Sequence, residues 1–126
     1  MRLGSIAASA LSAFSVDMLV RANNIANVNT PGFKAQDATL MTGPRGEGVL
    51  VGSIYQDMSP GPPRPWAAVA YESGGGALPA DRLEGSNTDL GREYVHMIAT
   101  QRAFDANAAV IRSYDDMSGT ILDLKA

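Results

Sequence analysis

Few side chains in this sequence of 126 residues have the type and spacing that metal binding or acid–base catalysis requires. His96 is the only histidine, and Glu93 and Asp89 precede it at positions that could share one face of a helix. A stable zinc site needs three or four converging ligands, and the sequence offers neither a second histidine nor a cysteine. The adjacent carboxylates Asp115 and Asp116 would point about 100° apart on a helix, which favours a solvated face over an acid–base pair. We therefore expect His96 to lie at a surface or an interface, and we expect no catalytic, cofactor-binding or metal site.

The bulk composition excludes several further classes of function. The net charge is -3 and basic residues do not cluster, so we expect no nucleic-acid partner and no small-molecule substrate. No stretch approaches 18 apolar residues, which predicts no membrane-spanning segment. The first eleven residues contain an Ala-Ser-Ala sequence but lack a dense leucine- or valine-rich core, so we do not interpret them as a signal peptide. Export, if it occurs, would then use another route.

A cluster of asparagines is the most unusual feature of the sequence. Four of them fall between Asn23 and Asn29, at the end of an apolar run and directly before a Thr-Pro-Gly sequence at residues 30–32. Asparagine is unfavourable inside a helix because its amide competes with the backbone. Asn23, Asn24 and Asn27 are spaced to share one helix face, where their amides could bond to the backbone of a neighbouring subunit and fix its register. The alternative is that they only fray the helix before a type II Pro-Gly turn.

Residues 3–29, which carry these amides, show the periodicity of a helix. Apolar residues recur at alternating steps of three and four, with Arg21 as the one polar interruption and with Ala7 and Gly4 continuing the series. The seam consists of Leu11, Phe14, Met18, Ile25 and Val28. A helix of this length would span roughly 40 Å. It could also be an ordinary amphipathic helix that packs on its own domain.

Residues 87–125 contain the longest helical pattern, with Asp89 among the candidate N-cap residues. Its apolar positions are Leu90, Tyr94, Met97, Gln101, Phe104, Ala108, Ile111, Tyr114, Met117, Ile121 and Leu124. The steps from Ala108 through residues 111 and 114 to Met117 are three residues each, which deletes one residue from the heptad register. This predicts overwinding or a kink near residues 111–114. The helix would be roughly 55 Å long, too long for this chain to bury alone. We therefore expect the two terminal helices to pair and then to pack against other copies or partners.

Residues 43–85 hold nine of the 13 glycines and six of the seven prolines, a density that excludes a long helix. Residues 49–55 are the best strand candidate, and we expect residues 66–71 to be its partner. An isolated two-stranded hairpin is marginal in water, so this segment must pack on the helices or on a neighbouring subunit.

Two segments resemble a known family. Residues 23–34 read Asn-Asn-Ile-Ala-Asn-Val-Asn-Thr-Pro-Gly-Phe-Lys, and this string is similar to the one that closes the N-terminal helix of the flagellar axial proteins of the rod, hook and hook-associated families. Gly85-Ser86-Asn87, followed by Met97-Ile98, by Gln-Arg-Ala-Phe at residues 101–104 and by Asn107, resembles the C-terminal segment of rod and hook proteins. The short middle looks most like that of the small proximal-rod proteins.

The resemblance implies a mainly α fold with a small β insertion. The terminal helices, within residues 1–40 and 86–126, would pair as a coiled coil to form the axial core domain, and residues 41–85 would form a hairpin-containing insertion. It implies a structural subunit of the proximal rod, the drive shaft that transmits motor torque. The alternatives are a hook-junction or other axial subunit, or a free-standing helical adaptor linked to secretion.

The resemblance also implies partners and a location. The partners would be other rod proteins, copies of this chain, the base of the basal body and the flagellar export apparatus. The chain would leave the cytoplasm unfolded through the flagellar type III apparatus, without a cleaved signal peptide, and would reside in the periplasmic rod. We expect the assembly interface to include Leu11, Phe14, Met18, Asn23, Asn24, Ile25, Asn27, Val28, Met97, Gln101, Phe104, Ala108, Ile111, Tyr114, Met117 and Ile121.

Overall fold

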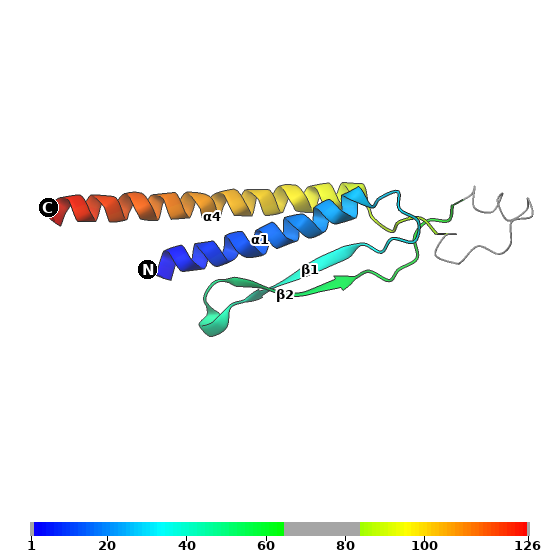
Figure 1. Cartoon of the computed structure of the whole chain (residues 1–126), viewed down its shortest axis with the longest axis horizontal. Helices are drawn as coiled ribbons and strands as arrows, with labels where there is room; N and C mark the ends of the chain where they lie inside the picture. Colours follow the sequence, from blue (N-terminus) through cyan, green and yellow to red (C-terminus); the bar gives the residue numbers. More distant parts are fainter. Residues whose placement is uncertain (1, 65–83, 126) are drawn as a thin grey trace, which may run out of the picture.

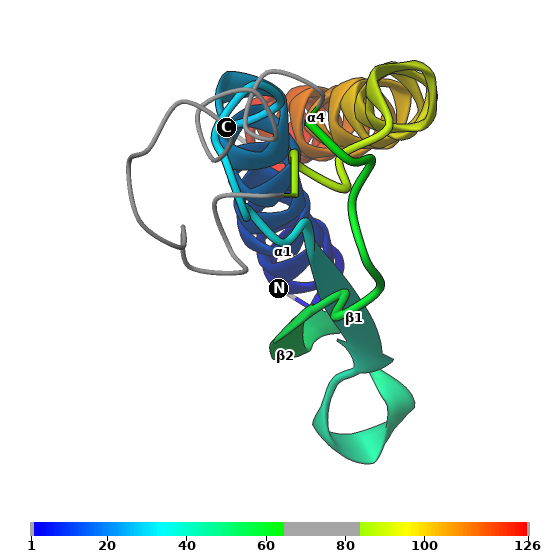
Figure 2. The ribbon, with the colours of Figure 1, turned by 90° about the vertical axis from the view of Figure 1, so that its right-hand side faces the viewer.

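The computed structural model describes residues 2–64 and 84–125, and it arranges them as three parallel layers (Figure 1). Helix α1 (Arg2–Ala26) is followed by strand β1 (Gln36–Thr42), a short 3-10 turn (Pro44–Gly46), strand β2 (Val49–Gln56) and the long helix α4 (Leu90–Lys125). The end-on view in Figure 2 shows α1 in the middle, with α4 on one side and the β hairpin on the other. The expectation of a mainly α fold with a small β element is confirmed.

The apolar residues that α1 buries are mostly alanines. The most buried apolar positions are Ala7, Ala10, Ala13 and Val20. The larger residues of the expected seam, such as Leu11, Phe14 and Met18, are only half-buried. Most of the buried positions thus lie one residue before the expected seam. Alanine at the line of contact lets two helix backbones approach closely, and bulky side chains then flank this line instead of forming it.

Helix α4 begins after Asp89, whose carboxylate accepts a hydrogen bond from the Arg92 backbone N–H at 3.1 Å, as expected for an N-cap. The helix then continues without interruption for 36 residues, and Figure 1 shows no bend where a kink was expected. The predicted kink near residues 111–114 is therefore wrong. A deleted residue overwinds a helix only where the helix must keep contact with a partner. Here the partner helix ends near that point, because Tyr114 lies beside Gly4, close to the start of α1.

The β hairpin directly follows α1 in the chain and packs against it. Strands β1 and β2 pair antiparallel, from Gln36 opposite Gln56 to Thr42 opposite Val49, with a bulge that leaves Gly52 as the extra residue. The strand expected at residues 49–55 is confirmed as β2. Its partner in the structure is β1, whereas the expected partner, residues 66–71, lies outside the described residues. The hairpin also begins at Gln36, before the domain boundary expected at residue 41.

Helix α1 differs from expectation in its overall apolarity. The segment Leu3–Ala26 is long and apolar enough to cross a membrane, judged by length and composition alone. The expectation of no membrane-spanning segment is therefore not confirmed, because alanines raise the mean hydropathy of this segment although it contains no run of 18 apolar residues. One such helix is weak evidence for a membrane span, since core helices meet the same criterion. Here α1 packs between α4 and the hairpin.

Candidate functional site at the junction of the helices and the hairpin

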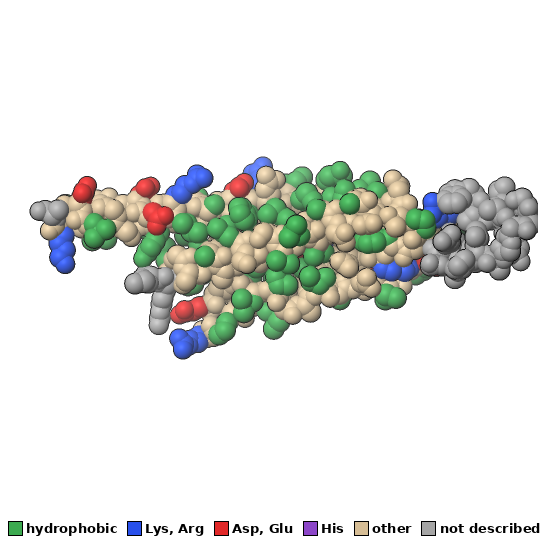
Figure 3. Space-filling model, in the orientation of Figure 1, with side chains coloured by type: hydrophobic (Ala, Val, Ile, Leu, Met, Phe, Trp, Pro, Cys, Tyr) green, Lys and Arg blue, Asp and Glu red, His purple; other side chains and the backbone are tan. Residues whose placement is uncertain are grey.

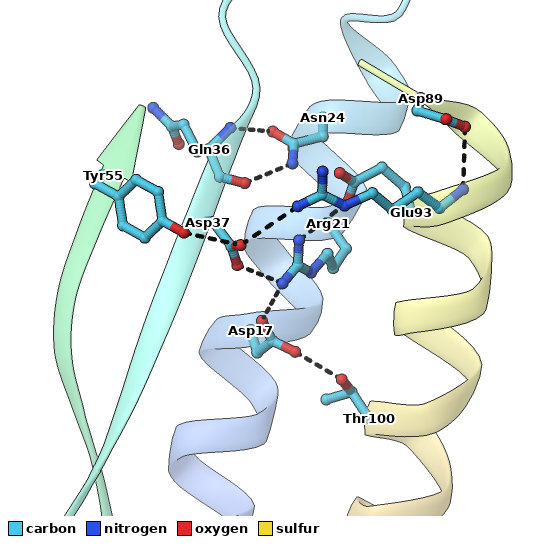
Figure 4. A network of polar contacts seen from close by, with 10 residues as sticks. Asp17, Arg21, Asn24, Gln36, Asp37, Tyr55, Asp89, Glu93 and Thr100 are labelled. Atoms are coloured by element: carbon cyan, nitrogen blue, oxygen red, sulfur yellow. Dashed lines mark hydrogen bonds and ion pairs between the residues drawn. The ribbon is translucent and has the colours of Figure 1, made fainter. Parts of the chain in front are cut away.

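Arg21 connects all three layers of the structure (Figure 4). It is 4% exposed, and its guanidinium group lies 2.5 Å from Asp37 of β1, 3.4 Å from Glu93 of α4 and 3.4 Å from Asp17 one turn earlier in α1. A buried charge is tolerated only when it is paired and hydrogen-bonded. The sequence suggested a polar interruption of an apolar seam at this position, whereas the structure places the centre of an ion network there.

The network holds its carboxylates in fixed positions. Burial disfavours the charged form of Arg21, but the nearby charges of Asp17, Asp37 and Glu93 outweigh this effect and raise the pKa of the guanidinium group. The Thr100 hydroxyl donates a hydrogen bond to Asp17 at 2.6 Å, and the Tyr55 hydroxyl donates one to Asp37 at 3.2 Å. Each of these two carboxylates is therefore oriented by a second partner, so the network fixes how α1 sits against α4 and β1.

Asn24 binds the backbone of β1, next to Arg21 in Figure 4. Its side chain is fully buried, its Nδ2 donates to the Gln36 carbonyl at 2.7 Å, and its Oδ1 accepts from the Gln36 N–H at 2.8 Å. These two bonds reproduce the pairing that a neighbouring strand would give to β1. Asn24 was expected to bond to a neighbouring subunit; in the structure, both of these bonds lie within the chain.

Asn23 and Asn27, the other two amides expected to share a helix face with Asn24, close the end of α1. Asn27 Nδ2 donates to the carbonyl and to the side-chain oxygen of Asn23, at 2.9 and 3.1 Å, and the Thr30 hydroxyl donates to Asn27 at 3.0 Å. A turn follows in which the Phe33 N–H bonds to the Thr30 carbonyl and Gly32 has a φ of 66°. The predicted type II turn is confirmed, because only glycine adopts this φ readily at the third position.

Asn87 holds β1 from the C-terminal part of the chain. Its Oδ1 accepts from the Ala35 N–H at 2.6 Å, and its Nδ2 donates to the carbonyls of Asp57 and Ser59 at 2.7 and 3.1 Å. Asn24 and Asn87 therefore bind adjacent backbone positions at the start of the hairpin. In the sequence, Asn87 belongs to the Gly85-Ser86-Asn87 motif, which gives no indication of these bonds. Its role depends on a contact 52 residues away, for which the sequence carries no local signal.

Lys34 and Glu84 join the two chain segments beside this site. Lys34 Nζ donates to Glu84 Oε2 at 3.0 Å and to the Ser59 carbonyl at 2.9 Å. The hydrogen bond from Lys34, together with its charge, lowers the pKa of the Glu84 carboxyl below its ordinary value of 4.5. The pair therefore contributes stability at neutral pH, and this contribution is lost as the pH falls below 4.5 and through the lower pKa of the folded state.

We expect the substitution Lys34→Met to raise the pKa of Glu84 toward 4.5, because the two largest lowering interactions come from Lys34 and only the backbone hydrogen bond with Gly61 remains. An NMR titration of the Glu84 side-chain carboxyl carbon measures this shift. Lys125→Met, at the far end of α4, is the matched control and should leave the titration unchanged. An unshifted Glu84 titration in the Lys34→Met protein would show that the pair does not form in solution.

An open pocket of about 430 Å³ lies beside the junction and is lined by residues of both charges, among others Arg21, Asp37, Tyr55, Asn87 and Arg92. The residues that the structure describes bring together no group of three His, Cys, Asp or Glu side chains that could hold a metal ion. The carboxylates beside Arg21 are engaged by its guanidinium group, and His96 is exposed on α4. The charged groups around Arg21 therefore connect chain segments.

The expected interface residues differ in exposure. Asn24 is buried. Four are exposed: Asn23, Gln101, Met117 and Ile121. The others are half-buried: Leu11, Phe14, Met18, Ile25, Asn27, Val28, Met97, Phe104, Ala108, Ile111 and Tyr114. Their contact with other subunits stays a prediction.

Comparison with known families matches both ends of the chain. Residues 5–34 match the family described as flagella basal body rod protein, and residues 80–124 match the family described as flagellar basal body rod FlgEFG protein C-terminal. The first match contains Arg21 and Asn24, and the second contains Asn87 and Glu93. The residues that form the junction thus come mainly from the two matched segments.

Individual relatives match over shorter stretches. The flagellar hook protein FlgE of Escherichia coli K12 is 40% identical over 50 residues, which are 40% of this chain and 12% of the hook protein. The flagellar hook protein FlgE of Caulobacter vibrioides is 39% identical over 54 residues, 43% of this chain and 9% of the relative. The flagellar basal-body rod protein FlgG of Bacillus subtilis is also 39% identical over 54 residues, 43% of this chain and 20% of the relative. The matches thus span a fifth or less of the length of these relatives.

Proposed function

Because this chain belongs to the flagellar rod and hook family of structural proteins, we propose that it is a subunit of the proximal rod. In this role it assembles with other rod proteins and with copies of itself into the shaft that transmits torque from the motor. It reaches the periplasmic part of the basal body through the flagellar export apparatus, without a cleaved signal peptide. Its functional surface is the outside of the paired terminal helices.

One observation carries this proposal: the two segments that match rod families fold into a single unit. Asn24, from the N-terminal match, and Asn87, from the C-terminal match, bind neighbouring backbone groups at the base of the hairpin. Only residues 27–89 separate the two helices, which supports a rod subunit without a large outer domain. The division of the chain into an axial core, residues 1–40 and 86–126, and an insertion, residues 41–85, remains part of the proposal.

Torque transmission follows from the way such a subunit packs. A rod that grows without closing into a ring needs a contact between two different surfaces of each subunit. Close-packed interfaces deform little, so helices packed as a coiled coil along the shaft resist twisting. Ion pairs such as those of Arg21 would keep the three layers of each subunit from sliding over one another.

A deletion in the host bacterium tests the proposed role. We expect cells without the gene to be non-motile and to lack a completed rod, and we expect the chain to co-purify with basal bodies from complemented cells. Electron microscopy of isolated basal bodies and mass spectrometry of the same preparation measure both. Complete rods in the deletion strain would overturn the proposal.

The hook is the second candidate location, since most of the relatives found are hook proteins. Gold-labelled antibody against this chain distinguishes the two locations on isolated hook–basal bodies. Label inside the rod supports the proposal, and label along the hook identifies a hook subunit.

Ile111 tests whether the α1–α4 pair matters for assembly. Ile111 is half-buried on α4. Truncation of a packed side chain costs roughly 2–5 kcal/mol, and Ile111→Asp should cost more because it also places a charge at an apolar position. We expect normal synthesis and export of the variant but no completed rod and no motility. Asp116→Asn, an exposed site on the same helix, should be nearly silent. Wild-type rod assembly by Ile111→Asp would show that this contact is dispensable.

A further inference from the structure

A bulge divides the β hairpin into two halves. The strand register shifts opposite Gly52, which is left as the extra residue of β2. The basal half, residues 36–39 and 53–56, is bound to α1 and α4 by the amide and ion pairs of the junction. The distal half, residues 40–51, takes no part in those bonds, so its position against α1 must have another cause.

Ser9 binds the distal half to α1. Its Oγ accepts a hydrogen bond from the Val49 N–H at 3.1 Å and donates one to the Ile6 carbonyl at 2.7 Å. The bond to Ile6 directs the hydroxyl hydrogen back along the helix, so the lone pairs of the oxygen remain available to the Val49 N–H. Ser9 therefore binds β2 at one end of the hairpin, as Asn24 binds β1 at the other end.

Gly48 allows the hairpin to come this close to α1. Its φ is 75°, a left-handed conformation that favours glycine. It also lies directly against Ser9, where a Cβ atom at position 48 would collide with the hydroxyl oxygen. Gly46 has the same φ of 75°, but a Cβ atom there would meet nothing within 4 Å. The two glycines thus share a backbone requirement, and Gly48 adds a requirement for close approach to the helix.

Apolar packing contributes little to the position of the distal half. Leu40, Met41 and Leu50 are exposed. Figure 3 shows apolar side chains along the surface of the hairpin and charged ones at its tip. A pocket of about 300 Å³ remains between the tip and the first turns of α1. A segment with few buried apolar contacts opens at a low cost in free energy, so the bond to Ser9 matters for its position.

We propose that the distal half is a hinged arm that pivots at Gly52, and that Ser9 and Gly48 form the latch that holds the arm on α1. Gly52 suits a pivot because it has no side chain, is exposed and interrupts the pairing of the strands. In the open form the arm keeps its own strand pairing but leaves α1. This movement is a property of the single chain, so it does not depend on the proposed role in the rod.

The absence of cysteine from the chain lets spin labels be placed at chosen exposed positions. The tip pair, Thr42→Cys with Ala8→Cys, connects the distal half to α1. The basal pair, Ser53→Cys with Ala22→Cys, connects the basal half to α1. Double electron–electron resonance on the purified full chain measures the distance within each pair. We expect one narrow distance for each pair when the latch is intact.

Three substitutions, each made in both labelled chains, test the latch. Ser9→Ala removes the acceptor of the Val49 N–H, and Gly48→Ala forces the arm away from the Ser9 hydroxyl, so each should add a second, longer distance for the tip pair. Gly46→Ala imposes the same backbone strain without a collision and is the matched control, in which the tip distance should stay single. The basal pair should not change in any of the three variants.

Three results would overturn the inference. A tip distance that stays single in both Ser9→Ala and Gly48→Ala would show that these residues form no latch. A second tip distance in Gly46→Ala as well would show that strain in the turn, rather than contact with Ser9, positions the arm. A basal pair that lengthens together with the tip pair would show that the pivot is not at Gly52. Ser9→Ala creates no collision, so it tests the latch even if Gly48→Ala does not fold.

Discussion

Replacing Arg21 by methionine is expected to destabilise the protein by roughly 3–5 kcal/mol, the usual cost of removing one partner from a buried ion pair. Arg21 is 4% exposed and is the group that compensates Asp17, Asp37 and Glu93. Without it, three carboxylates face one another at the junction of α1, β1 and α4. Urea unfolding of the purified chain, followed by circular dichroism, measures the loss.

Two further variants separate charge from packing. Arg92→Met removes a guanidinium group that is 59% exposed and lies 3.9 Å from Asp37, so it should cost no more than about 1 kcal/mol. Adding Asp37→Asn and Glu93→Gln to Arg21→Met should recover part of the stability, since it removes two uncompensated charges. Equal stability of the Arg21→Met and Arg92→Met proteins would contradict the role assigned to the network.

The second large effect is expected for Asn24→Ala. The substitution leaves the N–H and the carbonyl of Gln36 without their partner, and each unsatisfied buried backbone group costs roughly 1–3 kcal/mol. Gln36 is half-buried, so water should recover part of this loss. We expect lower stability and much faster amide hydrogen exchange at Gln36, because the hairpin loses its attachment to α1.

Asn23→Ala is the matched control, at the exposed position directly before Asn24. Alanine has a higher helix propensity than asparagine, which should offset the loss of the Asn27–Asn23 side-chain bond. Its stability should therefore change little, and exchange at Gln36 should not change. If Asn23→Ala and Asn24→Ala behave alike, the cluster only terminates the helix, and the binding of β1 by Asn24 has no energetic importance.

The elements with strong local signals could be predicted from the sequence. Asp89 before a periodic run indicated where α4 begins, and the Thr-Pro-Gly sequence indicated the turn that follows α1. Residues 49–55 have the β-branched and aromatic composition of a strand. Each of these features depends on a few residues that are close together in the sequence.

The contacts of the junction could not be predicted, because they join residues far apart in the chain. Arg21 is 72 residues from Glu93, and its role becomes visible only when α1 and α4 lie side by side. The pairing of β1 with β2 was not predicted either, in this case for a local reason. The turn between β1 and β2 depends on positive φ angles at Arg45, Gly46 and Gly48, and at Arg45 such an angle is unusual for a residue other than glycine.

The seam of α1 shows what periodicity alone leaves open. A helical pattern fixes the spacing of buried positions but not which of two adjacent rows faces the partner. The row of large side chains was expected to be the more buried, yet Ala10 and Ala13 lie deeper than Leu11 and Phe14. The size of the partner's side chains decides this choice, and that information resides in α4.

A density map of basal bodies isolated from the host strain, at a resolution that shows side chains, tests the central claim most directly. We expect the proximal rod to contain a subunit in which α1 lies between α4 and the β hairpin, with Arg21 facing Asp37 and Glu93. A rod in which every subunit is accounted for by other chains, or a map that places this chain only in the hook, would contradict it.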